Sequence, residues 1–146
     1  MAKAYVKLPD DFIEKISKLG NKTDEICEKM LNAGGEVVLA KVKSNLSSVI
    51  GNGTKYKSRS TGELEKSLGL SKVRLDKNGN YNIKIGFAES RGDGSSNAKI
   101  ANTIEYGKSD QVAKPFMKPA KSSSKTKCIE VMKATFDKEV NNIWPY

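Results

Sequence analysis

The most constraining feature of the sequence is a β-hairpin pattern near the middle of the chain. Apolar side chains alternate strictly with polar or small ones over residues 81–87, and Asn78-Gly79 lies just before them. Asn-Gly is a strong signal for a tight turn between antiparallel strands, and strict alternation indicates a strand with one buried face. We therefore predict two strands, over 70–76 and 81–87, joined by this turn. The alternating apolar residues of the second strand are Tyr81, Ile83, Ile85 and Phe87.

Helical patterns flank the hairpin on both sides. Pro9 and Asp10 supply start signals for a short helix over 9–19, and Thr23 or Asp24 can cap a longer helix that runs to about Ile50. At the other end of the chain, the serines at 122–124 can cap a C-terminal helix. Its apolar face has residues spaced by three or four positions. They are Ile129, Met132, Phe136, Val140 and Ile143.

Gly34 and Gly35 interrupt the long helical pattern. Each glycine costs a helix about 1 kcal/mol relative to alanine. Two explanations fit the pair: a kink or break into two helices, or a close approach of another helix, which could belong to a second subunit. The sequence does not choose between them.

Polar loops and proline-rich connections fill the rest of the chain. Residues 51–62 and 88–98 are rich in Gly, Ser and charged residues, and we expect both loops to be mobile. Ala98 to Tyr106 is a short helical or irregular piece, and the segment from Pro115 to Pro119 is a third strand or an ordered arm. The sequence thus predicts a single α+β domain over 1–146, with helices at both ends and a small antiparallel sheet between them.

The residue types argue against catalysis. The chain has no histidine, which removes the commonest general base and the commonest metal ligand. Cys27 and Cys128 have no metal-ligand spacing and fall beside apolar residues in helical patterns, as expected of reduced core thiols. No glycine-rich phosphate-binding motif and no run long enough to cross a membrane occurs. We expect no enzyme activity, no catalytic residue, no bound metal, no cofactor and no membrane contact.

The net charge of +9 favours contact with polyanions. Lys and Arg outnumber Asp and Glu most strongly over residues 41–77, where the candidate contacts are Lys55, Lys57 and Arg59. A basic nucleic-acid-binding module is therefore one alternative function, although the loop lacks the interleaved aromatics that stack on bases. A small enzyme or toxin carried by a prophage is a second and weaker alternative, because no catalytic constellation supports it.

Two segments resemble the signature of the siphophage tail-completion proteins, also called head–tail joining proteins. The first is Thr61-Gly62-Glu63-Leu64-Glu65-Lys66-Ser67-Leu68, which is similar to that family's TG-x-L-x-x-S-[IL] segment. The second extends from Ile100 to Ala120 and contains Ile104-Glu105-Tyr106-Gly107 and Lys114-Pro115-Phe116-Met117-Lys118-Pro119-Ala120. The order of the predicted elements also resembles the family, from the long helix to the last one.

The resemblance implies a phage or prophage virion structural protein at the head–tail junction. It implies self-association into a ring, with six copies as the expected number, contact with tail-tube or head-connector proteins, and possible non-specific contact with DNA. The protein would then be found in the bacterial host cytoplasm during assembly and later in the neck or tail of the virion. The candidate assembly residues are Thr61, Gly62, Leu64, Glu105, Gly107, Pro115, Phe116 and Pro119.

Individual roles follow for some of these residues. Thr61 and Gly62 can turn the chain into Leu64, whose side chain then anchors the segment in the core. Gly107 is expected to form a turn with positive φ. Phe116 can fill either the protein's own core or a groove on a neighbour, and the flanking prolines would stiffen that arm.

Overall fold

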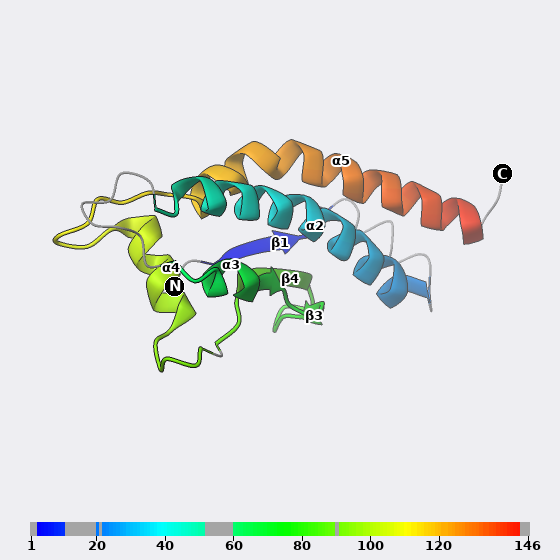
Figure 1. The fold of residues 1–146 in the computed structure, drawn as a ribbon. Helices are drawn as coiled ribbons and strands as arrows, with labels where there is room; N and C mark the ends of the chain where they lie inside the picture. The colour runs from blue at the N-terminus through cyan, green and yellow to red at the C-terminus, as the bar shows by residue number, and fades with distance from the viewer. Residues whose placement is uncertain (1–2, 11–19, 21, 52–59, 90, 144–146) are drawn as a thin grey trace.

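Two long helices lie side by side on one face of a small antiparallel sheet (Figure 1). The computed structural model describes residues 3–10, 20, 22–51, 60–89 and 91–143. Helices α2 (Thr23–Val49) and α5 (Met117–Ile143) form the helical layer. Two short helices, α3 (Glu63–Ser67) and α4 (Asn97–Tyr106), lie at one end of the molecule. The predicted α+β class is confirmed.

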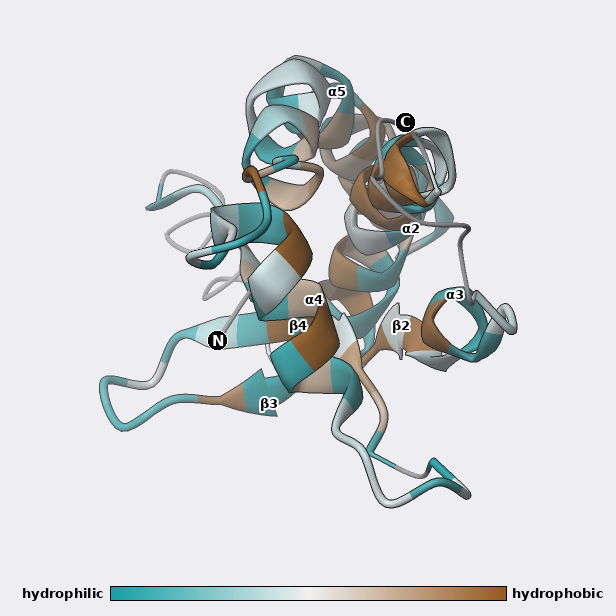
Figure 2. Ribbon diagram, turned by 60° about the vertical axis from the view of Figure 1, so that its left-hand side comes forward, coloured by the Kyte–Doolittle hydropathy of each residue, from teal (hydrophilic) through white to brown (hydrophobic). Residues whose placement is uncertain are grey.

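The sheet is built around its longest strand, β4 (Tyr81–Phe87). It pairs antiparallel with β1 (Ala4–Lys7) on one side, and with β2 (Leu68–Leu70) and β3 (Arg74–Leu75) on the other. Ile83 and Ile85 of β4 are fully buried against the helices, as the alternation predicts. Figure 2 shows the hydrophobic segments along α2 and the hydrophilic residues of the hairpin turn.

Strand β1 is missing from the expectations drawn from the sequence. Ala4, Val6 and Leu8 are buried whereas Tyr5 and Lys7 are exposed, so the two-residue period of a strand is present in this segment. The segment is only four residues long and has no turn signal beside it, which is why its alternation was not decisive. Pairing with β4 supplies the stability that the local sequence lacks.

The hairpin is confirmed at its turn and corrected in its first strand. Gly79 has φ +79°, and Asp76 Oδ1 accepts hydrogen bonds from the backbone N–H groups of Asn78 and Asn80. The strand predicted over 70–76 is divided into β2 and β3. The division lies at Ser71, whose Oγ accepts the Lys84 N–H at 2.9 Å, so a side chain takes a place in the ladder that a backbone carbonyl would otherwise hold.

Helix α2 passes through Gly34 and Gly35 without a break. A Cβ atom placed on Gly34 would lie 2.7 Å from Met132 Cγ and 3.1 Å from Cys128 Sγ, both on α5. Of the two explanations left open for this pair, the break into two helices does not occur, and the close approach of another helix is confirmed within the same chain. Cys27 and Cys128 are both buried in this core as free thiols, and burial raises the pKa of the Cys27 thiol to about 11.

We predict that Gly34→Leu lowers the free energy of unfolding by about 2 kcal/mol, because overpacking of the α2–α5 contact outweighs the gain in helix propensity. Urea denaturation followed by circular dichroism measures the change. Adding Met132→Ala makes room for the leucine, so the double variant should lose less than the sum of the two single losses. Asn32→Leu, on the exposed side of α2, is the control and should change stability by less than about 0.5 kcal/mol. Additive losses would contradict the close approach.

Two predicted segments lie largely outside the described residues. These are the short helix over 9–19, of which only Pro9 and Asp10 are described, and the central part of the loop over 51–62. The candidate contacts Lys55, Lys57 and Arg59 belong to the second segment. Their proposed contact with polyanions stays a prediction.

Candidate assembly site

The candidate site is the corner where α4 turns back into α5, and Glu105 is its centre. This carboxylate is 4% exposed. Its Oε2 accepts the backbone N–H groups of Phe116 at 2.8 Å and Met117 at 2.9 Å, and its Oε1 accepts that of Lys118 at 3.0 Å. Glu105 thus caps the N-terminus of α5 from another helix, where the partial positive charge of the helix end favours an anion.

The cap explains where α5 begins. An α-helix leaves four N–H groups unpaired at its start, here those of residues 116–119. Glu105 binds three of them, and the fourth position is Pro119, which has no N–H group. The start predicted at the serines of 122–124 is therefore wrong. The third strand that was one alternative for Pro115 to Pro119 is also wrong, because α5 begins at Met117 and includes Pro119 in its first turn.

Phe116 joins this corner to the core. Its side chain is fully buried and meets Phe87 of β4 edge to face, with the ring centroids 6.2 Å apart. Its carbonyl oxygen accepts a hydrogen bond from Asn45 Nδ2 of α2 at 3.1 Å. Of the two roles left open for Phe116, packing into the protein's own core is the one that the structure has.

Gly107 forms the tight turn that directs the chain away from α4. Its φ of 76° and ψ of −178° lie in a region that is almost exclusive to glycine. A Cβ atom at this position would lie 2.8 Å from both Ala113 N and Gln111 O. The chain then returns so that Lys114 N–H donates to Ile104 O at 2.7 Å. The predicted positive φ at Gly107 is confirmed.

The first resembling segment forms helix α3 beside this corner. Gly62 has φ +80°, and Leu64 is buried in the main core, as expected for a turn that directs the leucine inward. Thr61 is exposed, and its Oγ1 accepts the Glu63 N–H at 3.5 Å. Arg91 Nη2 then forms an ion pair with Glu63 Oε2 at 3.2 Å, which ties α3 to the segment before α4.

The segment that leads into α4 is held by hydrogen bonds. Glu89 Oε1 accepts the Ala98 N–H and the Ser96 hydroxyl, and its Oε2 accepts the Asn97 N–H. The Ala98 N–H, with these other donors, holds the pKa of Glu89 below its usual range. Asn97 is buried, receives a hydrogen bond from Arg91 Nη1 at 2.9 Å and donates to Ala88 O at 2.7 Å. The helical alternative for Ala98 to Tyr106 is confirmed, and the mobility of the 88–98 loop stays a prediction.

The candidate residues thus divide into an inner and an outer set. Leu64, Glu105 and Phe116 point inward and hold α3, α4 and α5 together. Thr61, Pro115 and Pro119 lie on the surface. Two further residues at this corner, Tyr106 and Val112, have large apolar side chains that are 66% and 81% exposed, and no sequence pattern selected them. Each of them is an apolar residue directly beside a turn, because Tyr106 precedes Gly107 and Val112 follows Gln111.

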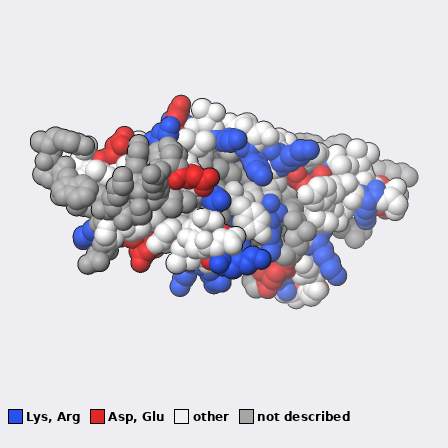
Figure 3. All heavy atoms as spheres, turned by 180° about the vertical axis from the view of Figure 1, so that it is seen from behind, with Lys and Arg blue, Asp and Glu red and all other residues white. Residues whose placement is uncertain are grey.

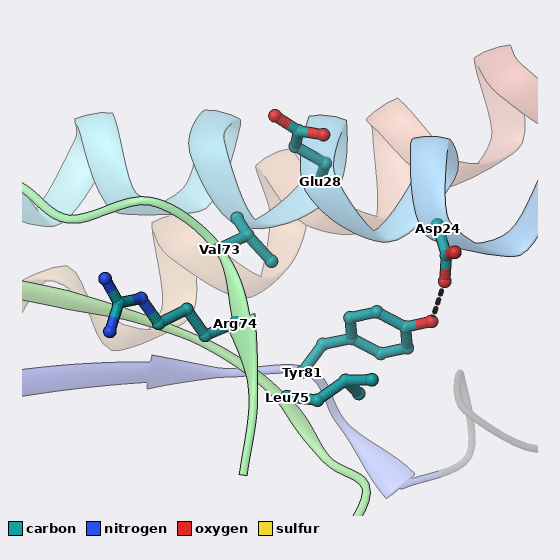
Figure 4. A pocket seen from close by; sticks show the side chains of 6 residues that line it. All are labelled: Asp24, Glu28, Val73, Arg74, Leu75 and Tyr81. Atoms are coloured by element: carbon teal, nitrogen blue, oxygen red, sulfur yellow. Dashed lines mark hydrogen bonds between the residues drawn. The ribbon is translucent and has the colours of Figure 1, made fainter.

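A shallow hollow of about 250 Å³ lies elsewhere, between the start of α2 and strand β3 (Figure 4). The Tyr81 hydroxyl donates a hydrogen bond to Asp24 there, and this bond raises the pKa of Tyr81 to about 12. A phenol with a raised pKa is a poorer general acid or base near neutral pH. Tyr81 therefore lacks the tuning that acid–base catalysis needs. The lining residues of the hollow are Asp24, Glu28, Val73, Arg74, Leu75 and Tyr81.

Among the described residues, no group of three or more acidic or cysteine side chains is placed to hold a metal ion. Within the same part of the chain, none of the helices has the length and apolar character needed to span a membrane.

The fold and its capped corner define a small helix-on-sheet domain in which Leu64, Glu105 and Phe116 hold the helices together. Residues 10–107, more than half of the chain, match the family model described as "Bacteriophage HK97-gp10, putative tail-component". The chain belongs to this HK97-gp10-like family of phage tail components. No curated protein and no solved structure matches it.

Family membership confirms the resemblance found in the sequence. It implies a structural, non-catalytic protein of the virion that contacts other virion proteins. The matched range includes Thr61, Gly62, Leu64, Glu105 and Gly107, whereas the segment from Pro115 to Pro119 lies beyond it.

Proposed function

We propose that this protein acts at the head–tail junction of a phage, where copies assemble into a ring that completes the tail or joins it to the head. The observation that carries the proposal is the match to the tail-component family over residues 10–107. The neighbours would be tail-tube or head-connector proteins, and six copies is the stoichiometry that we expect.

The α4–α5 corner supports this role by presenting a rigid surface. Glu105, Phe116 and Gly107 fix the path of the chain from the core to the surface, so that Tyr106 and Val112 are exposed on a constrained turn. Rigid presentation lowers the entropy that a surface loses when it binds a partner. We propose that this corner contacts a neighbouring subunit or virion protein.

Assembly would take place in the cytoplasm of the bacterial host, and the finished ring would stay in the neck or tail of the virion. DNA passes through the junction between head and tail, so a basic ring could also contact DNA without sequence preference. The excess of Lys and Arg in the chain is compatible with such contact.

The test is an early stop codon in this gene within its intact phage genome, followed by electron microscopy of the lysate. We expect filled heads and tails lying apart if the protein joins them, and abnormally long tails if it terminates tail growth. A complementing copy of the gene should restore normal particles. Infectious particles of normal appearance without the protein would contradict the proposal and favour a nucleic-acid-binding module instead.

A further inference from the structure

The helical layer carries its charge in two separate blocks. Helices α2 and α5 run antiparallel, because Asn45 Nδ2 of α2 binds the carbonyl of Phe116 whereas Lys29 Nζ of α2 lies 3.1 Å from Glu139 Oε2 of α5. The second half of α2 therefore lies beside the first half of α5. Gly34 and Met132 mark the middle of the pair.

One half of this layer, which we name the basic end, consists of residues 37–49 and 117–129. It contains lysines and no Asp or Glu at all. All of these lysines are exposed, and within the described part of the chain none of them forms an ion pair. They are Lys41, Lys43, Lys118, Lys121, Lys125 and Lys127.

The other half, residues 23–36 and 130–143, is the acidic end. It contains seven acidic residues against the three lysines Lys29, Lys133 and Lys138. In Figure 3, red side chains gather toward the left of the upper, helical edge, and blue side chains follow to their right. The acidic residues are Asp24, Glu25, Glu28, Glu36, Glu130, Asp137 and Glu139.

The two ends cannot neutralise each other within one molecule. Each helix has 27 residues, so the pair is roughly 40 Å long at 1.5 Å per residue. Fields between exposed charges decay over about 8 Å at physiological salt. Moreover, Lys118 lies in the first turn of α5, where the positive helix terminus makes a cation unfavourable. This placement does not stabilise the monomer, so a partner is its simplest physical explanation.

Apolar groups accompany the charge at both ends. Tyr106 and Val112 are exposed beside the start of α5, at the basic end. The hollow with Val73, Leu75 and Tyr81 lies beside Asp24 and Glu28, at the acidic end (Figure 4). An exposed aromatic side chain and a hollow that could receive it are what an interface needs beyond charge, since exposed ion pairs alone contribute little.

We propose that copies of this chain meet head to tail, with the basic end of one copy against the acidic end of the next. Two basic ends repel each other, and so do two acidic ends, which disfavours any contact in which the same end of two copies meets. A head-to-tail contact uses two different surfaces, and it generates a closed ring when the rotation between copies closes. The inference rests on the ring proposed above, because it names the surfaces that would build it.

Charge reversal in the full-length protein tests the contact. Lys121→Glu/Lys125→Glu lowers the charge of the basic end from +6 to +2, and Glu28→Lys/Glu36→Lys changes the charge of the acidic end from −4 to 0. Sedimentation velocity at low salt should show self-association of the wild type that weakens as salt is added. Each reversed variant alone should associate at least about tenfold more weakly, which corresponds to about 1.4 kcal/mol. Circular dichroism melting confirms that the variants are folded.

The decisive measurement is an equimolar mixture of the two reversed variants. The first variant keeps its acidic end and the second keeps its basic end, so one intact contact can form between them, and the mixture should regain a two-copy complex that neither variant forms alone. Lys3→Glu/Lys84→Glu is the matched control, because it makes the same charge change outside the helical layer and should leave association unchanged.

Several results would overturn the proposal. They are a monomeric wild type at every salt concentration, association that neither reversal weakens, and a mixture that does not regain complexes. Binding of a 30-base-pair DNA duplex that is lost in Lys121→Glu/Lys125→Glu, with a wild type that stays monomeric, would assign the basic end to DNA. The stop-codon experiment does not depend on these variants, so a joining role could stand while this contact fails.

Discussion

Glu105→Ala is expected to lower the free energy of unfolding by at least about 3 kcal/mol. The substitution leaves the N–H groups of residues 116–118 without an acceptor, two of them in buried hydrogen bonds. An unsatisfied buried donor costs about 1–3 kcal/mol, and loss of a helix cap alone costs about 1 kcal/mol. The expected loss is a large share of the stability of a domain of this size.

The measurement is urea denaturation of the full-length protein, with Glu105→Gln and Glu130→Ala beside Glu105→Ala. Glutamine keeps the volume and one acceptor oxygen but places an amide nitrogen against a donor, so it should lose about 1–2 kcal/mol. Glu130 is exposed on α5, and its removal should change stability by less than about 0.5 kcal/mol. Equal effects of the two alanine variants would show that the cap does not stabilise the fold.

Most of the fold could be predicted from local sequence patterns. The turn at Asn78-Gly79, the alternation of β4 and the helical period of α2 each depend on neighbouring residues, and all three are confirmed. The strand β1 could not be identified with equal strength, because its four residues gain their stability from pairing with β4. Propensity is a weak guide wherever tertiary contacts decide.

The candidate site shows the same division between local and distant causes. The start of α5 depends on Glu105, which lies in another helix. The capping residue was therefore wrongly expected among the serines of 122–124, which are local to the helix. The resemblance pointed to Glu105, Gly107 and Phe116, and the structure adds that these three act on one corner. Their part in assembly stays a prediction.

The distribution of charged side chains over the surface was harder to predict. The sequence places the basic excess over residues 41–77, whereas the fold brings 37–49 together with 117–129 into one block of lysines. Charges that are about 80 residues apart in the chain become neighbours only through the antiparallel packing of α2 and α5. A linear count of charges cannot recover this arrangement.

Gly107→Ala should be the second severe substitution, and Gly62→Ala provides a matched control. Both glycines have positive φ, at 76° and 80°. Gly62 has ψ −3°, in the left-handed region that other residues occupy at a cost of about 1 kcal/mol, and nothing lies within 4 Å of its added Cβ. Gly107 has ψ −178°, a conformation that costs other residues about 1–3 kcal/mol before any clash is counted.

The clash decides the difference between the two variants. The added Cβ at position 107 would lie 2.8 Å from Gln111 O and Ala113 N, and backbone atoms cannot swing aside as a flexible side chain can. The turn must open, which strains the bond from Lys114 N–H to Ile104 O and displaces the nearby cap at Glu105. We therefore expect Gly107→Ala to lose at least about 3 kcal/mol and Gly62→Ala about 1 kcal/mol in urea denaturation. Hydrogen exchange should also become faster at the amides of residues 116–118 in Gly107→Ala alone. Similar losses in the two variants, with unchanged exchange at these amides, would mean that the turn at Gly107 does not hold the α4–α5 corner in place.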